Sequence, residues 1–263
     1  MHFTKMHGLG NDYLYIFGEP KNPSDIAIKL SDRHFGAGSD GIICISHSQK
    51  ADFKMRIFNA DGSEAKMCGN GIRCVGKFVY DKGYTDKKFI SIETLSGVKY
   101  LTLQVAGGKV KTVAVDMGQA KAEKPINLTV DGETVSLIPV SVGNPHAVIF
   151  VDDIEKAPLT KLGPIIEHHE AFPDGVNVEF VEVLGADKLR MRVWERGSGV
   201  TMACGTGACA SVMAAIAAKL FHYDETVSVL LDGGTLKIQI APDNAVQMTG
   251  PAETVYEGET EIC

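Results

Sequence analysis

Residues 67–74 read MCGNGIRC and residues 203–209 read ACGTGAC, so that Cys204 follows Cys68 by 136 positions. In each copy a cysteine precedes Gly-x-Gly and then a run typical of a helix, over residues 75–80 and 210–220. Such a cysteine lies at or just before a helix N-terminus, where unpaired backbone N–H groups and the helix dipole lower a thiol's pKa. The glycines let backbone donors approach an anion closely. The two loops therefore predict two related sites, each with one activated thiol.

The repeat extends beyond the two loops. Matched segments recur in the same order at offsets of 133 to 137 positions, among them Gly10-Asn11 and Gly143-Asn144, Asp40-Gly41 and Asp174-Gly175, Met55-Arg56 and Met191-Arg192, and residues 90–92 and 227–229. An ordered series of this kind indicates two copies of one unit of about 120 residues. We expect the first unit to span residues 1–116, completed by a C-terminal strand within residues 252–263. The second unit is expected to span residues 117–251.

The composition is that of an ordinary globular protein, since 44% of the 263 residues are hydrophobic and 22% are charged. The formal net charge of −7 and the lack of a basic cluster argue against nucleic acid as a partner. The N-terminus lacks the apolar segment of a secretory signal, and the longest apolar run, residues 211–220, is too short to span a bilayer. We therefore expect no membrane partner, a cytoplasmic location and reduced cysteines.

Hydrophobic alternation and turn signals predict a fold rich in strands. In the first unit we expect two helices, one over residues 24–30 capped by Ser24 and one after Cys68, and strands within residues 1–18, 42–46, 53–59, 90–94, 98–105 and 110–117. In the second unit we expect helices near residues 159–168 and after Cys204, and strands at residues 137–142, 147–151, 177–183, 188–194, 226–231 and 235–240. The predicted fold class is α+β, with two pseudo-symmetric repeats. Each repeat would be a curved, barrel-like sheet around a central helix, with the active site in the cleft between them.

Two thiols at equivalent places of a repeat suit the inversion of a carbon centre. Inversion needs a proton removed from one face of the carbon and another delivered to the opposite face, and a pseudo-two-fold repeat supplies groups on both sides. One cysteine must be thiolate and the other thiol, so Cys68 and Cys204 would titrate as a coupled dyad. His146 and Glu195 lie on loops matched by the repeat and are the expected tuners of the thiol pKa values. Four backbone N–H groups would stabilise the carbanion through the substrate carboxylate, those of Gly69, Asn70, Gly205 and Thr206.

Five ordered segments resemble the diaminopimelate epimerase family. They are HGLGNDY (residues 7–13), RIFNADGSEAKMCGNGIRC (56–74), GNPH (143–146), PDGVNVEF (173–180) and WERGSGVTMACGTGACA (194–210). The resemblance covers essentially the whole chain. It implies an epimerase that interconverts LL- and meso-diaminopimelate in lysine and peptidoglycan-precursor synthesis, without pyridoxal phosphate or another cofactor.

The resemblance also implies roles for individual residues. Cys68 and Cys204 would be the acid/base pair. The substrate, a diamino diacid, would be held by the backbone at Gly69-Asn70 and Gly205-Thr206 and by the side chains of Asn11, Asn59, Asn144, Asn177, Glu195 and Arg196. These types suit such a ligand, because Asn both donates and accepts, Arg binds carboxylate and Glu accepts from ammonium. Gly41 stands where some members carry a substrate-contacting Gln, which leaves the breadth of substrates open.

Two alternatives stay open. The chain could be a racemase of another amino acid, such as proline or histidine, or a non-catalytic thiol protein that senses redox state or binds metal. The cysteine spacings differ from the CxxC of zinc sites, so we expect no metal. Asn59 and Asn177 are also common turn formers. The oligomeric state is open, with a homodimer among the options. We interpret the other cysteines as small buried hydrophobic residues, namely Cys44, Cys74, Cys209 and Cys263.

Overall fold

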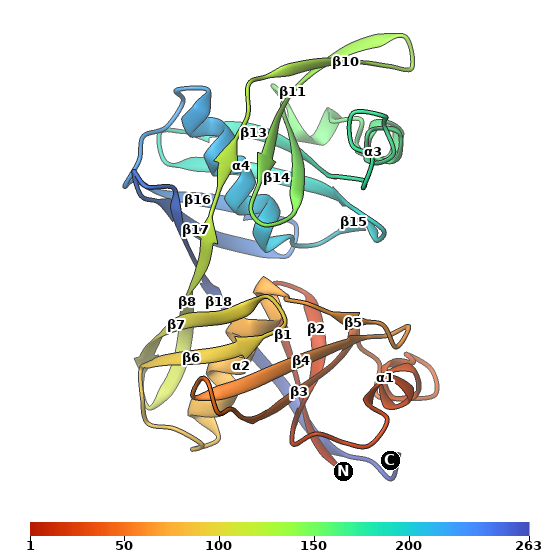
Figure 1. The fold of residues 1–263 in the computed structure, drawn as a ribbon, viewed down its shortest axis with the longest axis vertical. Helices are drawn as coiled ribbons and strands as arrows, with labels where there is room; N and C mark the ends of the chain where they lie inside the picture. The colour runs from red at the N-terminus through yellow and green to blue at the C-terminus, as the bar shows by residue number, and fades with distance from the viewer. Residues whose placement is uncertain (263) are drawn as a thin grey trace. The chain divides into compact units, whose positions relative to one another are not determined.

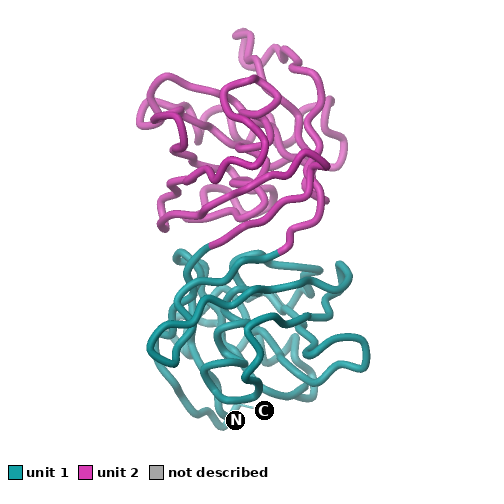
Figure 2. The backbone as a smooth tube through the Cα atoms, turned by 90° about the vertical axis from the view of Figure 1, so that its left-hand side faces the viewer, with its two compact units in different colours: residues 1–115, 250–263 teal, residues 116–249 magenta. Residues whose placement is uncertain are grey.

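The computed structural model describes residues 1–262 and divides the chain into two compact units, coloured separately in Figure 2. The first unit contains residues 1–115 and the C-terminal part of the chain from residue 250 on, and the second contains residues 116–249. Strands predominate in both units, and each has two α-helices within the described residues. The α+β fold class is therefore confirmed. The final cysteine, for which we predicted burial, lies outside the described residues.

In the first unit a curved sheet wraps around helix α2. The elements of this unit are β1 (His2–Gly8), β2 (Asn11–Phe17), α1 (Pro23–Ser31), β3 (Gly41–His47), β4 (Phe53–Asn59), β5 (Glu64–Ala65), α2 (Gly69–Asp81), β6 (Phe89–Thr94), β7 (Gly97–Ala106), β8 (Lys109–Gln119), which continues into the second unit, and β19 (Glu253–Glu259). Every residue of α2 from Asn70 to Val79 is buried, because the strands surround this helix (Figure 1).

The second unit has the same plan around helix α4. Its elements are β9 (Lys121–Ala122), β10 (Ile126–Val130), β11 (Glu133–Ser141), β12 (Pro145–Phe150), the 3-10 helix η1 (Ile154–Lys156), α3 (Leu159–Glu167), β13 (Asn177–Gly185), β14 (Lys188–Glu195), β15 (Gly199–Thr201), α4 (Gly205–Ala217), β16 (Thr226–Leu231), β17 (Gly234–Ile240) and β18 (Ala245–Pro251). Figure 1 shows β13, β14, β16 and β17 around α4.

The order of strand pairing is the same in both units. In the first unit it runs β19–β1–β2–β3–β4–β6–β7–β8, and in the second β9–β11–β12–β13–β14–β16–β17–β18. The parallel pairs fall at equivalent places, β2–β3 with β12–β13 and β4–β6 with β14–β16, and the other pairs are antiparallel. The repeat predicted from the sequence is thus confirmed strand by strand.

Small residues let the strands come close to each central helix. In α4 four alanines are fully buried, Ala208, Ala210, Ala214 and Ala215. In α2 a Cβ at Gly76 would lie only 2.9 Å from Leu101 and Leu103 of β7. A helix that is apolar nearly all round, as α4 is, is a buried helix, and α2 is buried although it carries Arg73 and Lys77. Each Cys-Gly-x-Gly loop therefore begins a helix whose position the sheet fixes.

One expectation about an element was wrong, and two of the longer strands were not predicted. Helix α1 is capped by Asn22, in the left-handed conformation, and not by Ser24. Proline is favoured in the first turn of a helix, so Pro23 starts the helix one residue earlier than expected. Among the strands of five or more residues, β10 and β18 were not predicted. In the order of pairing β18 is equivalent to β8, whereas β10, which pairs with β11, has no counterpart in the first unit. It packs Leu128 and Val130 against Ile166 of α3 in one hydrophobic core.

Candidate active site

Both predicted thiols occupy the N-cap position of a central helix. Cys68 caps α2 and Cys204 caps α4, each with an extended backbone, and each sulfur accepts the backbone N–H of the residue three positions on, Gly71 or Gly207, at 3.3 Å. The cap satisfies one of the donors that a helix N-terminus leaves unpaired. The prediction that these cysteines lie at helix N-termini is confirmed.

The second glycine of each motif is required by the space around the sulfur. A Cβ at Gly207 would lie 2.7 Å from Oε1 of Glu179 and 3.3 Å from Sγ of Cys204. A Cβ at Gly71 would lie 2.7 Å from Cδ1 of Ile43 and 3.5 Å from the Cys68 sulfur. A side chain at either position would collide with atoms next to the cysteine. Glycine at the second position therefore lets the backbone N–H approach the sulfur.

Around Cys68 the first unit builds a polar network, which we call the Cys68 cluster. The Cys68 thiol donates to Oδ1 of Asn11 at 3.2 Å, and Nδ2 of Asn11 donates to Oδ2 of Asp40 at 2.8 Å. Asp40 also accepts from Arg33 at 2.9 Å. Because the Asp40 carboxylate only accepts, it fixes the amide of Asn11 with its carbonyl oxygen toward the sulfur.

Two other predicted site residues of the first unit, Asn59 and Asn70, have side chains hydrogen-bonded within that unit. Asn59 ends β4; its Nδ2 donates to Ser63 at 3.1 Å, and its Oδ1 accepts from the Tyr13 hydroxyl at 3.5 Å. Asn70 is buried, and its Oδ1 accepts from Nη1 of Arg73 at 3.1 Å. Asn59 therefore supports the turn that follows β4 and also accepts from the Tyr13 hydroxyl.

Around Cys204 the second unit builds the Cys204 cluster, a chain of hydrogen bonds. The Cys204 sulfur lies 3.5 Å from Oγ1 of Thr206, which accepts from Nδ2 of Asn144 at 3.2 Å. Oδ1 of Asn144 lies 3.0 Å from Nε2 of His146, and Nδ1 of His146 lies 2.7 Å from Oε1 of Glu179. The predicted residues Asn144, His146 and Thr206 are thus brought together with the thiol. Glu179 was not predicted.

The remaining predicted residues of the second unit lie on neighbouring segments. Asn177 is buried; its Oδ1 accepts the N–H of Arg196 at 3.0 Å, and its Nδ2 donates to the Pro145 carbonyl oxygen at 3.0 Å. Asn177 therefore joins the GNPH segment to the turn after β14. The exposed Arg196 side chain donates to the Asp174 carbonyl oxygen at 2.8 Å. On the same turn, Glu195 accepts from the Thr201 hydroxyl at 2.8 Å.

The electrostatic surroundings of Cys204 oppose ionisation. Burial raises the pKa of the Cys204 thiol well above its ordinary value of 9.0, and the carboxylates of Glu195 and Glu179 raise it further. Hydrogen bonds from Thr206 and Gly207 act in the opposite direction. The expected lowering of the thiol pKa at a helix N-terminus is therefore wrong for Cys204, because burial and two carboxylates outweigh it.

The cysteines interpreted as small hydrophobic residues are buried in the described part of the chain. Cys44 is 3% exposed, and Cys74 and Cys209 are inaccessible. Burial raises the pKa of Cys44 to about 12 and that of Cys74 to about 11. Thiols of this kind are inert at neutral pH.

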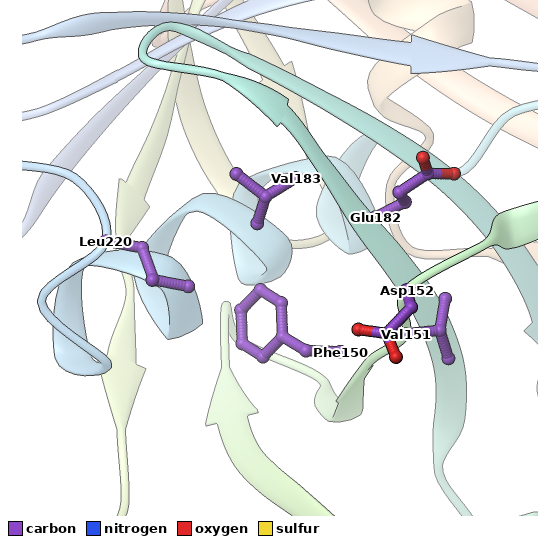
Figure 3. A pocket seen from close by; sticks show the side chains of 6 residues that line it. All are labelled: Phe150, Val151, Asp152, Glu182, Val183 and Leu220. Carbon is purple, nitrogen blue, oxygen red and sulfur yellow. The ribbon is translucent and has the colours of Figure 1, made fainter.

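Residues 1–262 contain no group of three or more His, Cys, Asp or Glu side chains placed to hold a metal ion. No helix among them is long and apolar enough to cross a membrane. A pocket in the second unit is lined by Phe150, Val151, Asp152, Glu182, Val183 and Leu220, and Figure 3 shows the apolar side chains around it with the two carboxylates to one side. None of these six is a predicted site residue.

The family model for diaminopimelate epimerase matches this chain over residues 3–123 and 138–255. The gap inside this match, residues 124–137, contains β10 and the start of β11, the hairpin that the first unit lacks.

Curated relatives agree with that match, and a solved structure shares the fold. The diaminopimelate epimerase of Acetivibrio thermocellus is 52% identical over 100% of this chain and 99% of its own length. The enzyme of the same name from Methanococcus maripaludis is also 52% identical, over 100% of both chains. Among solved structures, a probable proline racemase from Agrobacterium radiobacter K84 is similar to this chain with a TM-score of 0.78 and 16% identity, over 100% of this chain and 93% of its own. At that identity the likeness shows the fold alone.

Proposed function

The chain belongs to the diaminopimelate epimerase family, and on that premise we propose that it interconverts LL- and meso-diaminopimelate. The reaction is an isomerisation at one α-carbon and uses no pyridoxal phosphate. The proposal includes a place in lysine and peptidoglycan-precursor synthesis and a cytoplasmic location.

We propose that Cys68 and Cys204 transfer the protons. One sulfur, as thiolate, takes the α-proton from one face of the carbon, and the other, as thiol, delivers a proton to the opposite face. Charge balances because one thiolate and one thiol are present before and after each turnover, with their roles exchanged. The observation that carries this proposal is the shared cap geometry, with each sulfur 3.3 Å from the backbone nitrogen three positions on. It requires both thiols to reach one carbon when substrate is bound.

The carbanion formed between the two transfers needs stabilisation. We propose that the backbone N–H groups at the start of α2 and α4 supply it, by donating to the substrate carboxylate. These are the groups of Gly69 and Asn70 in the first unit and of Gly205 and Thr206 in the second. Oriented donors of this type are worth several kcal/mol, on the order of a 100-fold to 1000-fold rate effect for each one.

Six side chains are proposed to hold the diamino diacid, which carries an ammonium and a carboxylate at each end. They are Asn11, Asn59, Asn144, Asn177, Glu195 and Arg196. Support comes from their chemistry, since amides both donate and accept, guanidinium pairs with carboxylate, and a carboxylate accepts from ammonium. Two of them, Asn11 and Asn144, are hydrogen-bonded partners of the thiol clusters.

We propose that His146 and Glu195 tune the thiol pKa values. For Glu195 the support is electrostatic, because its carboxylate raises the pKa of Cys204. For His146 it is geometric, because the ring reaches the Cys204 cluster through Asn144.

The test is isomerisation in deuterated buffer with LL-diaminopimelate, meso-diaminopimelate, proline and histidine, followed by mass spectrometry and NMR. We expect solvent deuterium at the inverted centre of the diaminopimelate product. At early times the recovered substrate should carry none, as two separate groups predict. Exchange into proline or histidine alone would identify a different racemase. A reduced protein with no turnover on any of the four would support the non-catalytic thiol alternative.

Variants complete the test. Cys68→Ala and Cys204→Ala should each abolish inversion, whereas Cys44→Ala, which removes a buried thiol far from either cap in the sequence, should not. Inversion that survived either of the first two changes would exclude a two-thiol mechanism.

A monomer and a homodimer remain alternatives for the form in solution, and light scattering distinguishes them.

A further inference from the structure

Glu179 is a buried carboxylate with one hydrogen-bonded partner. Both Glu179 and His146 have side chains with no exposed surface, and the Nδ1–Oε1 distance is 2.7 Å. The second oxygen of Glu179, Oε2, has no hydrogen-bond partner among residues 1–262. Keeping a buried carboxylate charged costs several kcal/mol or more unless a hydrogen-bonded cation is paired with it. In that span, His146 is the only group placed to supply such a cation through a hydrogen bond, as the imidazolium.

A doubly protonated ring gives direction to the chain of hydrogen bonds. Nε2 of His146 then donates to Oδ1 of Asn144 at 3.0 Å, which leaves Nδ2 of Asn144 to donate to Oγ1 of Thr206 at 3.2 Å. Since Oγ1 of Thr206 already accepts, its own hydrogen is available for the Cys204 sulfur at 3.5 Å. A neutral ring with an acceptor at Nε2 would turn the Asn144 amide around, and the Thr206 hydrogen would point to Asn144 instead.

The first unit shows the opposite arrangement at the equivalent asparagine. There the Asp40 carboxylate accepts from Nδ2 of Asn11, so Oδ1 faces the Cys68 sulfur and the thiol donates to it. In each unit a charged residue fixes the orientation of the amide. The Asp40 anion is hydrogen-bonded to Asn11, and the His146 cation is hydrogen-bonded to Asn144. The Cys68 cluster thus ends in an acceptor, which favours the thiol. The Cys204 cluster ends in a donor, which favours the thiolate.

We propose that Glu179 is a positioning residue that, through His146 and Asn144, directs the Thr206 hydroxyl onto the Cys204 sulfur. It holds the ring protonated, and the ring fixes the amide. The inference rests on the proposed role of Cys204. It adds Glu179, a residue that has no part in the proposed proton transfer or substrate binding. The hydroxyl stabilises the thiolate against the burial and the carboxylates that oppose it.

The direction in which Glu179→Gln shifts the titration midpoint of Cys204 separates this proposal from a simple effect of charge. The groups that act on Cys204 are Glu179 on β13, Glu195 on β14 and Thr206 on α4, and His146 on β12 is linked to it through Asn144 and Thr206. If Glu179 acted only through its negative charge, Glu179→Gln would make the thiolate easier to form. If it acts through the relay, the change also removes the ring proton, so that the net charge of the pair stays the same and the hydrogen bond to the sulfur is lost. The thiolate then becomes harder to form.

The experiment titrates Cys204 without turnover, so its outcome does not depend on which substrate the enzyme uses. Thiolate formation is followed by ultraviolet absorbance in the Cys68→Ala protein, and the Cys68→Ala/Cys204→Ala protein with the same further change is subtracted. We expect Glu179→Gln to move the titration midpoint of Cys204 upward by about one pH unit, which corresponds to one lost hydrogen bond to a charged group. A midpoint that fell or stayed in place would overturn the proposal.

Two further variants complete the design. Thr206→Val keeps the shape and removes the hydroxyl, so it should raise the midpoint by the same amount, and adding Glu179→Gln should raise it no further. Additive shifts would show that Glu179 acts independently of Thr206 and would refute the relay. Because Thr206 is only half-buried, this variant tests the last link even if Glu179→Gln does not fold. The control is Glu182→Gln on the same strand, whose carboxylate accepts from the Ile154 N–H and should leave the midpoint unchanged.

Discussion

The buried guanidinium of Arg73 donates through Nε to the carbonyl oxygen of Pro251 at 3.1 Å, which ties α2 to a residue 178 positions away in the sequence. Its Nη1 donates to the Gly69 carbonyl oxygen and to Oδ1 of Asn70, both at 3.1 Å. Arg73 therefore holds the first turn of α2, directly after Cys68, through three acceptors. One side chain therefore fixes the backbone next to the Cys68 thiol.

We predict that Arg73→Met lowers the free energy of unfolding by about 3 kcal/mol, because three acceptors lose a charged donor in a buried site. Urea denaturation at neutral pH measures the change. Arg73→Lys keeps the charge but loses the planar fork, so its loss should be intermediate. An Arg73→Met protein as stable as the unchanged chain would show that these contacts contribute nothing to stability.

Much of the fold follows from the repeat, because pairs of segments at nearly constant offsets constrain two units at once. The strand at residues 226–231 and the one at 53–59 were predicted to the residue. The β10–β11 hairpin was missed although Asp131-Gly132 is a strong hairpin signal. The first unit offers no counterpart, so an interpretation guided by the repeat passed over it. Its apolar residues are buried against α3, a contact that the local sequence of the hairpin does not reveal.

The candidate site was predictable where chemistry is local and hidden where it depends on contacts across the fold. The N-cap cysteines follow from Cys-Gly-x-Gly before a helical run. Glu179 and Arg73 were missed because their partners lie 33 and up to 178 positions away. A signal existed for Glu179, since it is the charged residue within the run Asn177 to Val181, which is buried throughout. A charge in such a run needs a partner and marks a candidate site.

Glu167 gives a pH-dependent contribution to stability. Its Oε2 accepts from Nε1 of Trp194 at 2.7 Å and its Oε1 from the Gly197 N–H at 2.8 Å, so it holds the turn that carries Glu195 and Arg196. Burial pushes the pKa of Glu167 upward, but the hydrogen bonds from Trp194 and Gly197 more than offset it, and the net pKa lies below 4.5. The stabilisation is therefore fully present above about pH 4.5 and is lost as the pH falls through the lower, folded-state pKa.

We predict that Glu167→Gln lowers the unfolding free energy by about 1 to 2 kcal/mol at neutral pH, since an amide cannot accept both hydrogen bonds in the same way. The difference from the unchanged protein should shrink as the pH falls below 4.5. Urea denaturation across that range measures both. The exposed Glu170→Gln serves as the control and should show no such pH dependence. A difference that stayed constant with pH would contradict the assignment of this titration to Glu167.

The two cap glycines should differ in their tolerance of a methyl group. At Gly207 the new Cβ meets the buried Glu179 oxygen at 2.7 Å, whereas at Gly71 it meets the tip of the Ile43 side chain at the same distance. An isoleucine methyl can move by rotation, but Glu179 is fixed by its pair with His146. We predict that Gly207→Ala lowers kcat by about 100-fold or more, as a small displacement at a reacting group does, and that Gly71→Ala has a smaller effect. Steady-state kinetics on diaminopimelate compares them, and equal losses would contradict this explanation.

The glycine at position 41 cannot simply be exchanged for the Gln that some relatives were expected to carry there. A Cβ on Gly41 would lie 2.2 Å from the Phe58 carbonyl oxygen and 2.9 Å from both Cα of Asn59 and the Tyr13 ring. Two of these atoms belong to the backbone of β4, which pairs with β3 at this point, so the strands would have to separate. We predict that Gly41→Gln lowers the unfolding free energy by about 2 to 3 kcal/mol and weakens substrate binding through Asn59. Gly185→Gln, at a site with open space around its Cα, should cost little in the same urea denaturation. A Gly41→Gln protein that was as stable as the unchanged protein and had a lower KM would contradict this prediction. It would show that β3 and β4 can separate at this point and that position 41 belongs to the substrate site, as the resemblance implies.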